Sequence, residues 1–151
     1  MKNYIILGLF VAIFTASITS CETSDLNTNN QNDTFLLEKN GTTNGHWNLI
    51  NIKGGFLGLN EDYKPGDVKW TFNSKNSTLS IEDNISKGVS YDIIKPGDYH
   101  YYILNKKGIS YLFIEDFEFG HIIRIKNTLK IDQGNTTSGP LTDGYVLTFK
   151  K

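Results

Sequence analysis

The chain has 151 residues, of which 21% are charged, and a formal net charge of −1 at pH 7. A nucleic-acid-binding domain needs a basic surface, so this near-neutral balance argues against nucleic acid as a partner. A single cysteine excludes an intramolecular disulfide framework, and the fold must therefore be stabilised by its hydrophobic core alone.

The amino-terminal segment, residues 1–20, has the layout of a secretory signal peptide. Lys2 provides the positive start, and Tyr4 to Ala16 is an almost unbroken apolar run. A membrane-spanning helix needs roughly 20 apolar residues, and this run ends in threonines and serines before reaching that length. We therefore expect a signal helix that is cleaved rather than a permanent span.

The only cysteine, Cys21, directly follows this segment in the stretch "ITSC". The stretch resembles the lipobox of bacterial lipoproteins. The resemblance implies cleavage before Cys21, a diacylglycerol on its sulfur and attachment to the cell envelope, with the outer membrane as the expected location. Two or three acyl chains on one residue give stable attachment, since each buried methylene contributes about 0.8 kcal/mol. The alternatives are a non-lipidated secretory signal and a buried thiol in a cytosolic protein.

Residues 21–44 form the expected linker between this anchor and the folded domain. They are rich in Asn, Thr, Asp and Ser, a composition that buries too little apolar surface to order itself. A coil of this length has an average end-to-end distance of roughly 25 Å. Phe35-Leu36-Leu37 interrupts the polar composition, and we expect it to dock as a short turn of helix. A partner-binding motif is the alternative.

Residues 45–151 contain short apolar runs separated by turn signals at near-regular spacing, which predicts an all-β domain. In "DVKWTF", Val68, Trp70 and Phe72 face one side of a strand, and the residues between them face the other. No stretch after the signal shows a sustained helical period. The expected strands, eight or nine in number, lie near 46–53, 67–73, 77–83, 88–94, 98–105, 109–115, 117–126, 127–133 and 143–150.

The turns indicate how these strands are connected. Lys-Pro-Gly-Asp occurs at 64–67 and at 95–98, each time before a strand, with proline and glycine where a type II turn requires them. Sequential antiparallel strands leave exposed edges unless the sheet closes on itself. We therefore predict an antiparallel up-and-down barrel of eight or nine strands, with room inside for side chains or for one small ligand.

The first predicted strand opens with Gly45-His46-Trp47, which resembles the Gly-x-Trp signature of lipocalins. Together with "GG", "YKPGDVKWTFN", "STLSI" and the terminal "DGYVLTFKK", the pattern is similar to that of bacterial lipocalin-like lipoproteins. The resemblance implies a calycin-type barrel over residues 45–151, with Gly45 and Trp47 closing its narrow end. In lipocalins an arginine from beyond the last strand stacks on this tryptophan, whereas here two lysines occupy that position and the only arginine is Arg124.

Aromatic residues make up 13% of the chain and are concentrated in "YHYYIL" and "YLFIEDFEF". Ligand pockets are mostly apolar with a few polar groups, and tyrosine offers both characters. Two functions stay open. The barrel binds a small hydrophobic or amphipathic ligand, or it is filled by side chains and presents loops such as 54–66 to an envelope protein partner or inhibits an exogenous enzyme. The expected ligand contacts are Trp70, Tyr91, Tyr99, Tyr101 and His121.

His121 is the polar residue of greatest interest among these. It shares the strand alternation of Phe117, Phe119, Ile123 and Ile125, so we expect it on an apolar face. There it would orient a ligand carboxylate or titrate near neutral pH. The alternatives are a hydrogen-bonded core histidine and a strand whose other face is the one inside the barrel.

Motifs for catalysis or metal binding are not found. The three histidines lie on different predicted strands without carboxylate-flanked spacing, so no metal or cofactor is expected. There is no G-x-S-x-G elbow and no phosphate-cradling glycine loop. We therefore expect a protein that is not an enzyme. Hydrolysis or isomerisation inside the cavity is the remaining alternative, and loss of turnover after His121→Ala would support it.

Overall fold

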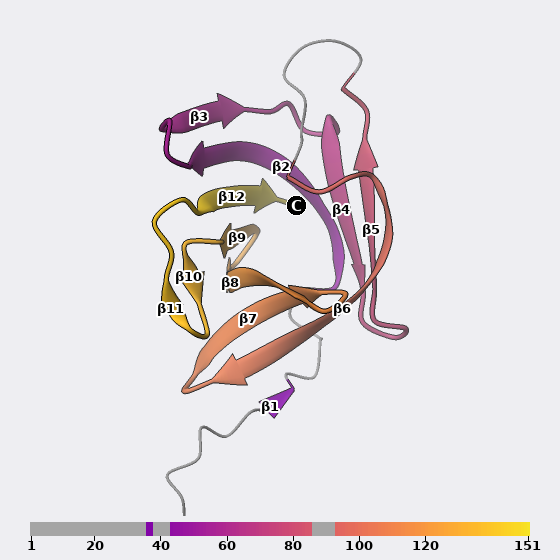
Figure 1. Ribbon diagram of the computed structural model, residues 1–151. Coiled ribbons are helices and arrows are strands. Elements are labelled where there is room, and N and C mark those ends of the chain that lie inside the picture. The colour runs from indigo at the N-terminus through magenta and orange to yellow at the C-terminus, as the bar shows by residue number, and fades with distance from the viewer. Residues whose placement is uncertain (1–35, 38–42, 86–92) are drawn as a thin grey trace, which may run out of the picture. The chain divides into compact units, whose positions relative to one another are not determined.

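The computed structural model describes residues 36–37, 43–85 and 93–151. Every regular element among them is a β-strand (Figure 1). The expected signal peptide, the expected lipidation site Cys21, most of the linker and Tyr91 lie outside these residues. Within the described ranges, no helix is long and apolar enough to cross a membrane.

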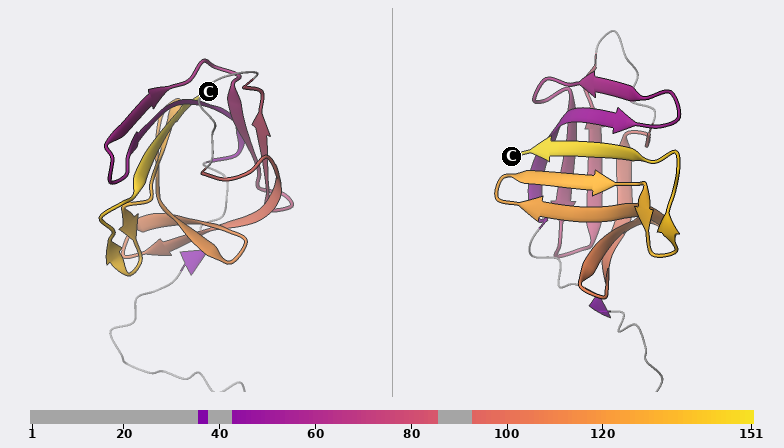
Figure 2. Two further views of the ribbon diagram at one scale, coloured as in Figure 1. Left: turned by 45° about the horizontal axis from the view of Figure 1, so that its top comes forward. Right: turned by 90° about the vertical axis from the view of Figure 1, so that its left-hand side faces the viewer.

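Eight strands form a closed antiparallel barrel: β2 (Gly45–Gly54), β4 (Val68–Asn73), β5 (Thr78–Asp83), β6 (Gly97–Lys106), β7 (Ile109–Ile114), β8 (Phe117–Ile125), β9 (Thr128–Asp132) and β12 (Tyr145–Lys150). Each strand pairs with the next in this order, and β12 pairs back with β2. The left view of Figure 2 shows the resulting ring of strands. The predicted up-and-down barrel is confirmed, and its eight strands correspond to eight of the nine predicted segments.

The predicted strand at 88–94 is the one that does not appear in the ring. Residues 86–92 lie outside the described part of the chain, and Ile93 and Ile94 form a bend rather than a strand. β6, which starts at Gly97, instead pairs directly with β5. The closed barrel is therefore completed without this segment.

Four short strands were not predicted: β1 (Leu36–Leu37), β3 (Leu59–Asp62), β10 (Asn135–Thr136) and β11 (Gly139–Pro140). β1 pairs with β6, so the expected helical turn is wrong for Leu36 and Leu37. The reason is that the free edge of β6 offers backbone groups that a short extended segment can pair with. β3 pairs with the second half of β2, so residues 54–66 are largely a hairpin rather than an open loop. β10 and β11 pair only with each other.

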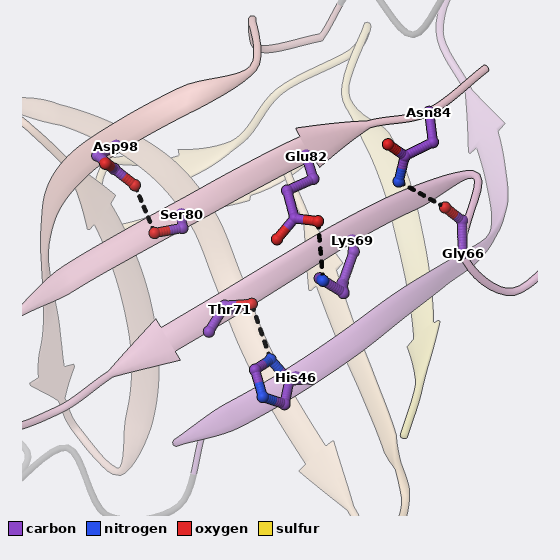
Figure 3. Close-up of polar contacts among 8 residues, drawn as sticks. All are labelled: His46, Gly66, Lys69, Thr71, Ser80, Glu82, Asn84 and Asp98. Atoms are coloured by element: carbon purple, nitrogen blue, oxygen red, sulfur yellow. Dashed lines mark hydrogen bonds and ion pairs between the residues drawn. The ribbon is translucent and has the colours of Figure 1, made fainter. Parts of the chain in front are cut away.

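The strand alternation places apolar side chains inside the barrel, as β4 illustrates. Val68, Trp70 and Phe72 are buried, and the intervening Lys69 and Thr71 lie on the outer face, which confirms the predicted pattern. On that face Lys69 pairs with Glu82 of β5 at 2.8 Å (Figure 3).

Two further outer contacts in Figure 3 also join neighbouring strands. The Thr71 hydroxyl lies 2.9 Å from Nδ1 of His46, and Ser80 donates a hydrogen bond to Asp98. Polar side chains therefore cover the outside of β2, β4, β5 and β6, and the hydrophobic core lies within the ring.

The first Lys-Pro-Gly-Asp sequence forms the turn expected of it. The amide of Asp67 donates to the carbonyl of Lys64 at 3.0 Å, and Gly66 has a φ of 96°. This positive φ is what the third position of a type II turn requires. In the second copy, the glycine is already the first residue of β6.

Candidate functional site

Trp47 lies near the start of β2, at one end of the barrel, and its indole is fully buried. Its Nε1 donates a hydrogen bond to the carbonyl of Thr43 at 2.7 Å. Two cations lie over the ring, with the guanidinium carbon of Arg124 at 5.6 Å and Nζ of Lys151 at 5.1 Å from its centroid. The arginine contact typical of lipocalins is thus made from β8 instead of from beyond the last strand.

Gly45 is the first residue of β2 and lies at the same end of the barrel as Trp47. Its φ of 112° is favourable only for glycine, and a Cβ there would meet nothing closer than Nζ of Lys151 at 3.8 Å. Backbone conformation, and not lack of space, is therefore the reason for glycine at this position of the Gly-x-Trp sequence.

Aromatic rings fill the barrel next to Trp47. Trp70, the cross-strand partner of Trp47, has its ring centroid 5.0 Å from that of Phe149 and 5.5 Å from that of Phe119. Tyr101 meets Phe72 edge-on at 5.0 Å. Trp70 and Tyr101, both expected to contact a ligand, are fully buried in this cluster. This part of the interior is filled by the protein's own side chains.

The cluster contains polar atoms that lack a hydrogen bond within the described structure: Nε1 of Trp70, the hydroxyl of Tyr101 and the hydroxyl of Thr43. Burial raises the pKa of Tyr101, and the neighbouring Thr43 side chain partly opposes this shift. Burial is the larger of the two effects and favours the neutral phenol, so Tyr101 contributes no charge to the barrel interior at physiological pH.

The strand ends remote from Trp47 surround a cavity of about 680 Å³. Ligand pockets typically have volumes of about 300–1,000 Å³, so the cavity is of ligand size. Its apolar wall comes from Ile52 of β2, Leu59 of β3, Ile114 of β7 and the bend at Ile93 and Ile94. The interior is therefore divided into a filled end and an open end.

Five aromatic residues also line this cavity: Tyr63, Tyr99, Phe117, Phe119 and Tyr145. Tyr99 is the one predicted ligand contact that the structure places here. Its hydroxyl donates to the carbonyl of Lys95 at 2.7 Å, which fixes the ring against the start of β6. The cavity thus has the apolar and aromatic lining of a binding site.

The polar groups of the cavity are few. The hydroxyl of Tyr63 donates to Oε2 of Glu61 at 3.3 Å, and Oε1 of Glu115 accepts from the amide of His100 at 2.8 Å. Gln133 adds an uncharged amide. Glu61 and Glu115 are the only charged side chains among the described residues that line the cavity.

A groove of about 490 Å³ adjoins the cavity and shares Phe117, Phe119, Gln133 and Tyr145 with it. Its outer wall includes Thr136 and the segment 141–144. The β10–β11 hairpin beside the groove is fixed to β8, because the hydroxyl of Thr137 donates to Oε2 of Glu118 at 2.7 Å. The cavity and groove together form a continuous mouth at this end of the barrel.

His121 does not lie on the face that simple alternation predicts. The pairing of β7 and β8 shifts register between Leu112 and Phe113, opposite Gly120, whose φ is 131°. Phe119 and Ile122 both belong to the core as a result. His121 therefore faces outward, because a bulge reverses the alternation that a sequence pattern assumes to be constant.

On the outer face, the ring of His121 lies 5.9 Å from that of Tyr111, and its cross-strand partner is Asp132. Burial lowers the pKa of His121, and the Asp132 carboxylate partly opposes this shift. His121 is not among the residues that line the cavity. Its environment is that of a partly buried surface histidine.

Several cavity residues were missed by sequence reasoning, among them Glu61, Tyr63, Glu115 and Tyr145. Strand alternation gave no signal for Glu61 as a cavity residue, since the unpredicted strand β3 carries it. In residues 43–85 and 93–151, no group of three or more His, Cys, Asp and Glu side chains is placed to hold a metal ion.

Comparison with protein-family models, curated proteins and solved structures finds no match to this chain. Inference about its function therefore rests on the barrel and on the sequence of the segment that precedes it.

Proposed function

We propose that this is a lipid-anchored cell-envelope protein whose lipocalin-like barrel binds one small hydrophobic or amphipathic molecule. The observation that carries the proposal is the cavity of about 680 Å³ at the end of the barrel remote from Trp47. Its lining is predominantly apolar and aromatic, with a few polar groups at fixed positions, as is usual for small-molecule sites. No catalytic role is proposed.

The division of the interior supports binding at one end only. Trp47, Trp70 and Phe149 are fully buried in the filled end and leave no room for a ligand there. The wider end is bordered by partly buried side chains such as Leu59, Tyr99 and Tyr145, which pack against the core without closing the cavity. A ligand would therefore enter through the mouth and rest on the aromatic cluster.

Filling the cavity tests this proposal. Leu59 points into the cavity from β3, so Leu59→Trp should reduce ligand occupancy at least about tenfold by taking up the volume that the ligand needs. Occupancy is measured by native mass spectrometry on protein expressed from residue 22, offered lipid extract from its own host, with denaturing extraction to identify what is bound.

Leu57→Trp is the matched control, because Leu57 lies two residues away in the same hairpin and is 93% exposed. It should leave occupancy unchanged. A wild-type domain that stays empty with every extract, or equal occupancy in both variants, would contradict binding in this cavity.

The membrane anchor is tested at Cys21. Cys21→Ser removes the sulfur that would carry the diacylglycerol, so the protein should move from the membrane fraction to the soluble fraction. The measurement is membrane fractionation combined with intact mass, which reports both location and signal cleavage. If the variant remains membrane-bound and wild-type protein has the unmodified full-length mass, the anchor proposal fails.

A second candidate function is supported by the tip of the β2–β3 hairpin. Phe56 and Leu57 are 88% and 93% exposed at this tip, between glycines with positive φ. Exposed apolar side chains on a projecting hairpin are suited to docking an envelope protein. Stoichiometric recovery of one protein by the wild-type domain, lost in Phe56→Ser, would favour this function over ligand binding.

A further inference from the structure

The cavity carries negative charge and no positive charge among its described lining residues. Glu61 and Glu115 provide two carboxylates, and no lysine or arginine is part of this lining. Glu118 and Asp143 line the adjoining groove, which adds two further carboxylates to the same mouth. Lys95, whose carbonyl accepts the Tyr99 hydrogen bond, is exposed and is not part of the lining.

The aromatic residues of the cavity, like its carboxylates, favour a cationic ligand. The face of an aromatic ring carries partial negative charge and attracts cations, with a gain of about 0.5–2 kcal/mol that increases as water is removed. Tyr63, which is hydrogen-bonded to Glu61, combines a ring face and a carboxylate at one place. Apolar neighbours such as Leu59 and Ile52 lower the local dielectric constant and strengthen attraction to a cation.

A group of cations lies at the end of the barrel that contains Trp47. Arg124 and Lys151 lie over Trp47, and Lys126 and Lys150 are exposed at the adjacent strand ends. These groups are separated from the cavity by the aromatic cluster around Trp70. A ligand carboxylate or phosphate in the cavity would therefore face carboxylates without a neutralising cation from the described lining.

We propose that the ligand is a cationic amphiphile, with an ammonium group near Glu61 and Tyr63 and its hydrocarbon part against the isoleucines. This inference rests on the proposed function and narrows it, because a fatty acid or a phospholipid with net negative charge would be disfavoured. The carboxylates and the faces of the aromatic rings together recognise the bound amine. The apolar wall contacts its hydrocarbon chain.

The test uses probes that share one chain length: dodecyltrimethylammonium, dodecanol and dodecanoate, each below its critical micelle concentration. Affinity is measured by calorimetry on protein expressed from residue 22, which retains all eight barrel strands and their core. The ammonium probe should bind roughly tenfold more tightly than dodecanol, and dodecanoate should bind most weakly.

The variant Glu61→Gln with Glu115→Gln should reduce the ammonium affinity to that of dodecanol. Glu82→Gln is the matched control, since Glu82 lies on the outer face in an ion pair with Lys69, and it should change none of the three affinities. If dodecanoate binds as tightly as the ammonium probe, the cationic preference is overturned while ligand binding stands. If no probe binds, ligand binding itself is overturned together with the preference.

Discussion

Replacing Trp47 by alanine should destabilise the barrel by about 3–5 kcal/mol, measured as the free energy of unfolding in urea. The indole is fully buried, and its loss leaves a cavity in the barrel interior. The variant also loses the hydrogen bond to the Thr43 carbonyl and the ring beneath Arg124 and Lys151. The free energy of unfolding of a small domain is about 5–15 kcal/mol, so this loss is a large fraction of the total stability.

Two control variants separate the contribution of the buried ring from that of its hydrogen bond. Trp47→Phe keeps an aromatic ring and removes the hydrogen-bond donor, so it should cost less than the alanine variant. Phe56→Ala removes an aromatic side chain that is 88% exposed and should change stability by no more than about 0.5 kcal/mol. If Trp47→Ala were as stable as Phe56→Ala, the buried indole would not stabilise the barrel.

Replacing Gly120 by alanine should cost roughly 2–5 kcal/mol, again as free energy of unfolding. Gly120 has a φ of 131°, which an alanine adopts only with strain. A Cβ at this position would also lie within clashing distance of the backbone carbonyl of Asp132 in β9, which cannot move without breaking the sheet. The bulge between β7 and β8 would shift, and with it the placement of Phe119 and Ile122 in the core.

Gly139→Ala is the matched control for this variant. Gly139 also has a positive φ, of 119°, and a Cβ there would meet no atom within 4 Å. It therefore reports the backbone strain without the clash, and it should cost less than Gly120→Ala. Equal losses in the two variants would show that close packing at the bulge is unimportant.

Local sequence patterns were sufficient to predict the strands of the ring. In β4 and β12, residues two apart are apolar and become buried, because the side chains of a strand alternate strictly between its two faces. The predicted turn at 64–67 likewise depends on residues that are adjacent in sequence. Where such a pattern is uninterrupted, the chain specifies both the strand and its inward face.

Features that depend on pairing between distant segments were not predictable in this way. β3 has the sequence Leu-Asn-Glu-Asp, which has little strand character, and it is extended because it pairs with β2. His121 was expected on the same face as Phe119, but the bulge at Gly120, which depends on the fit of β8 against β7 and β9, separates the two. The arginine that lies over Trp47 comes from β8, a strand that is far from Trp47 in sequence.

The sequence by itself determined an all-β domain and the eight strands that form its ring. It also contains the lipobox-like stretch that leads us to propose a lipid anchor at Cys21. Only the tertiary structure decided that Trp70 and Tyr101 fill the core while Tyr99 borders a cavity, and that Glu61 and Glu115 line the same space. The physical reason is that alternation assigns a side chain to the inside of a barrel, whereas its depth and neighbours depend on the stagger of strands and on bulges made between segments far apart in the chain.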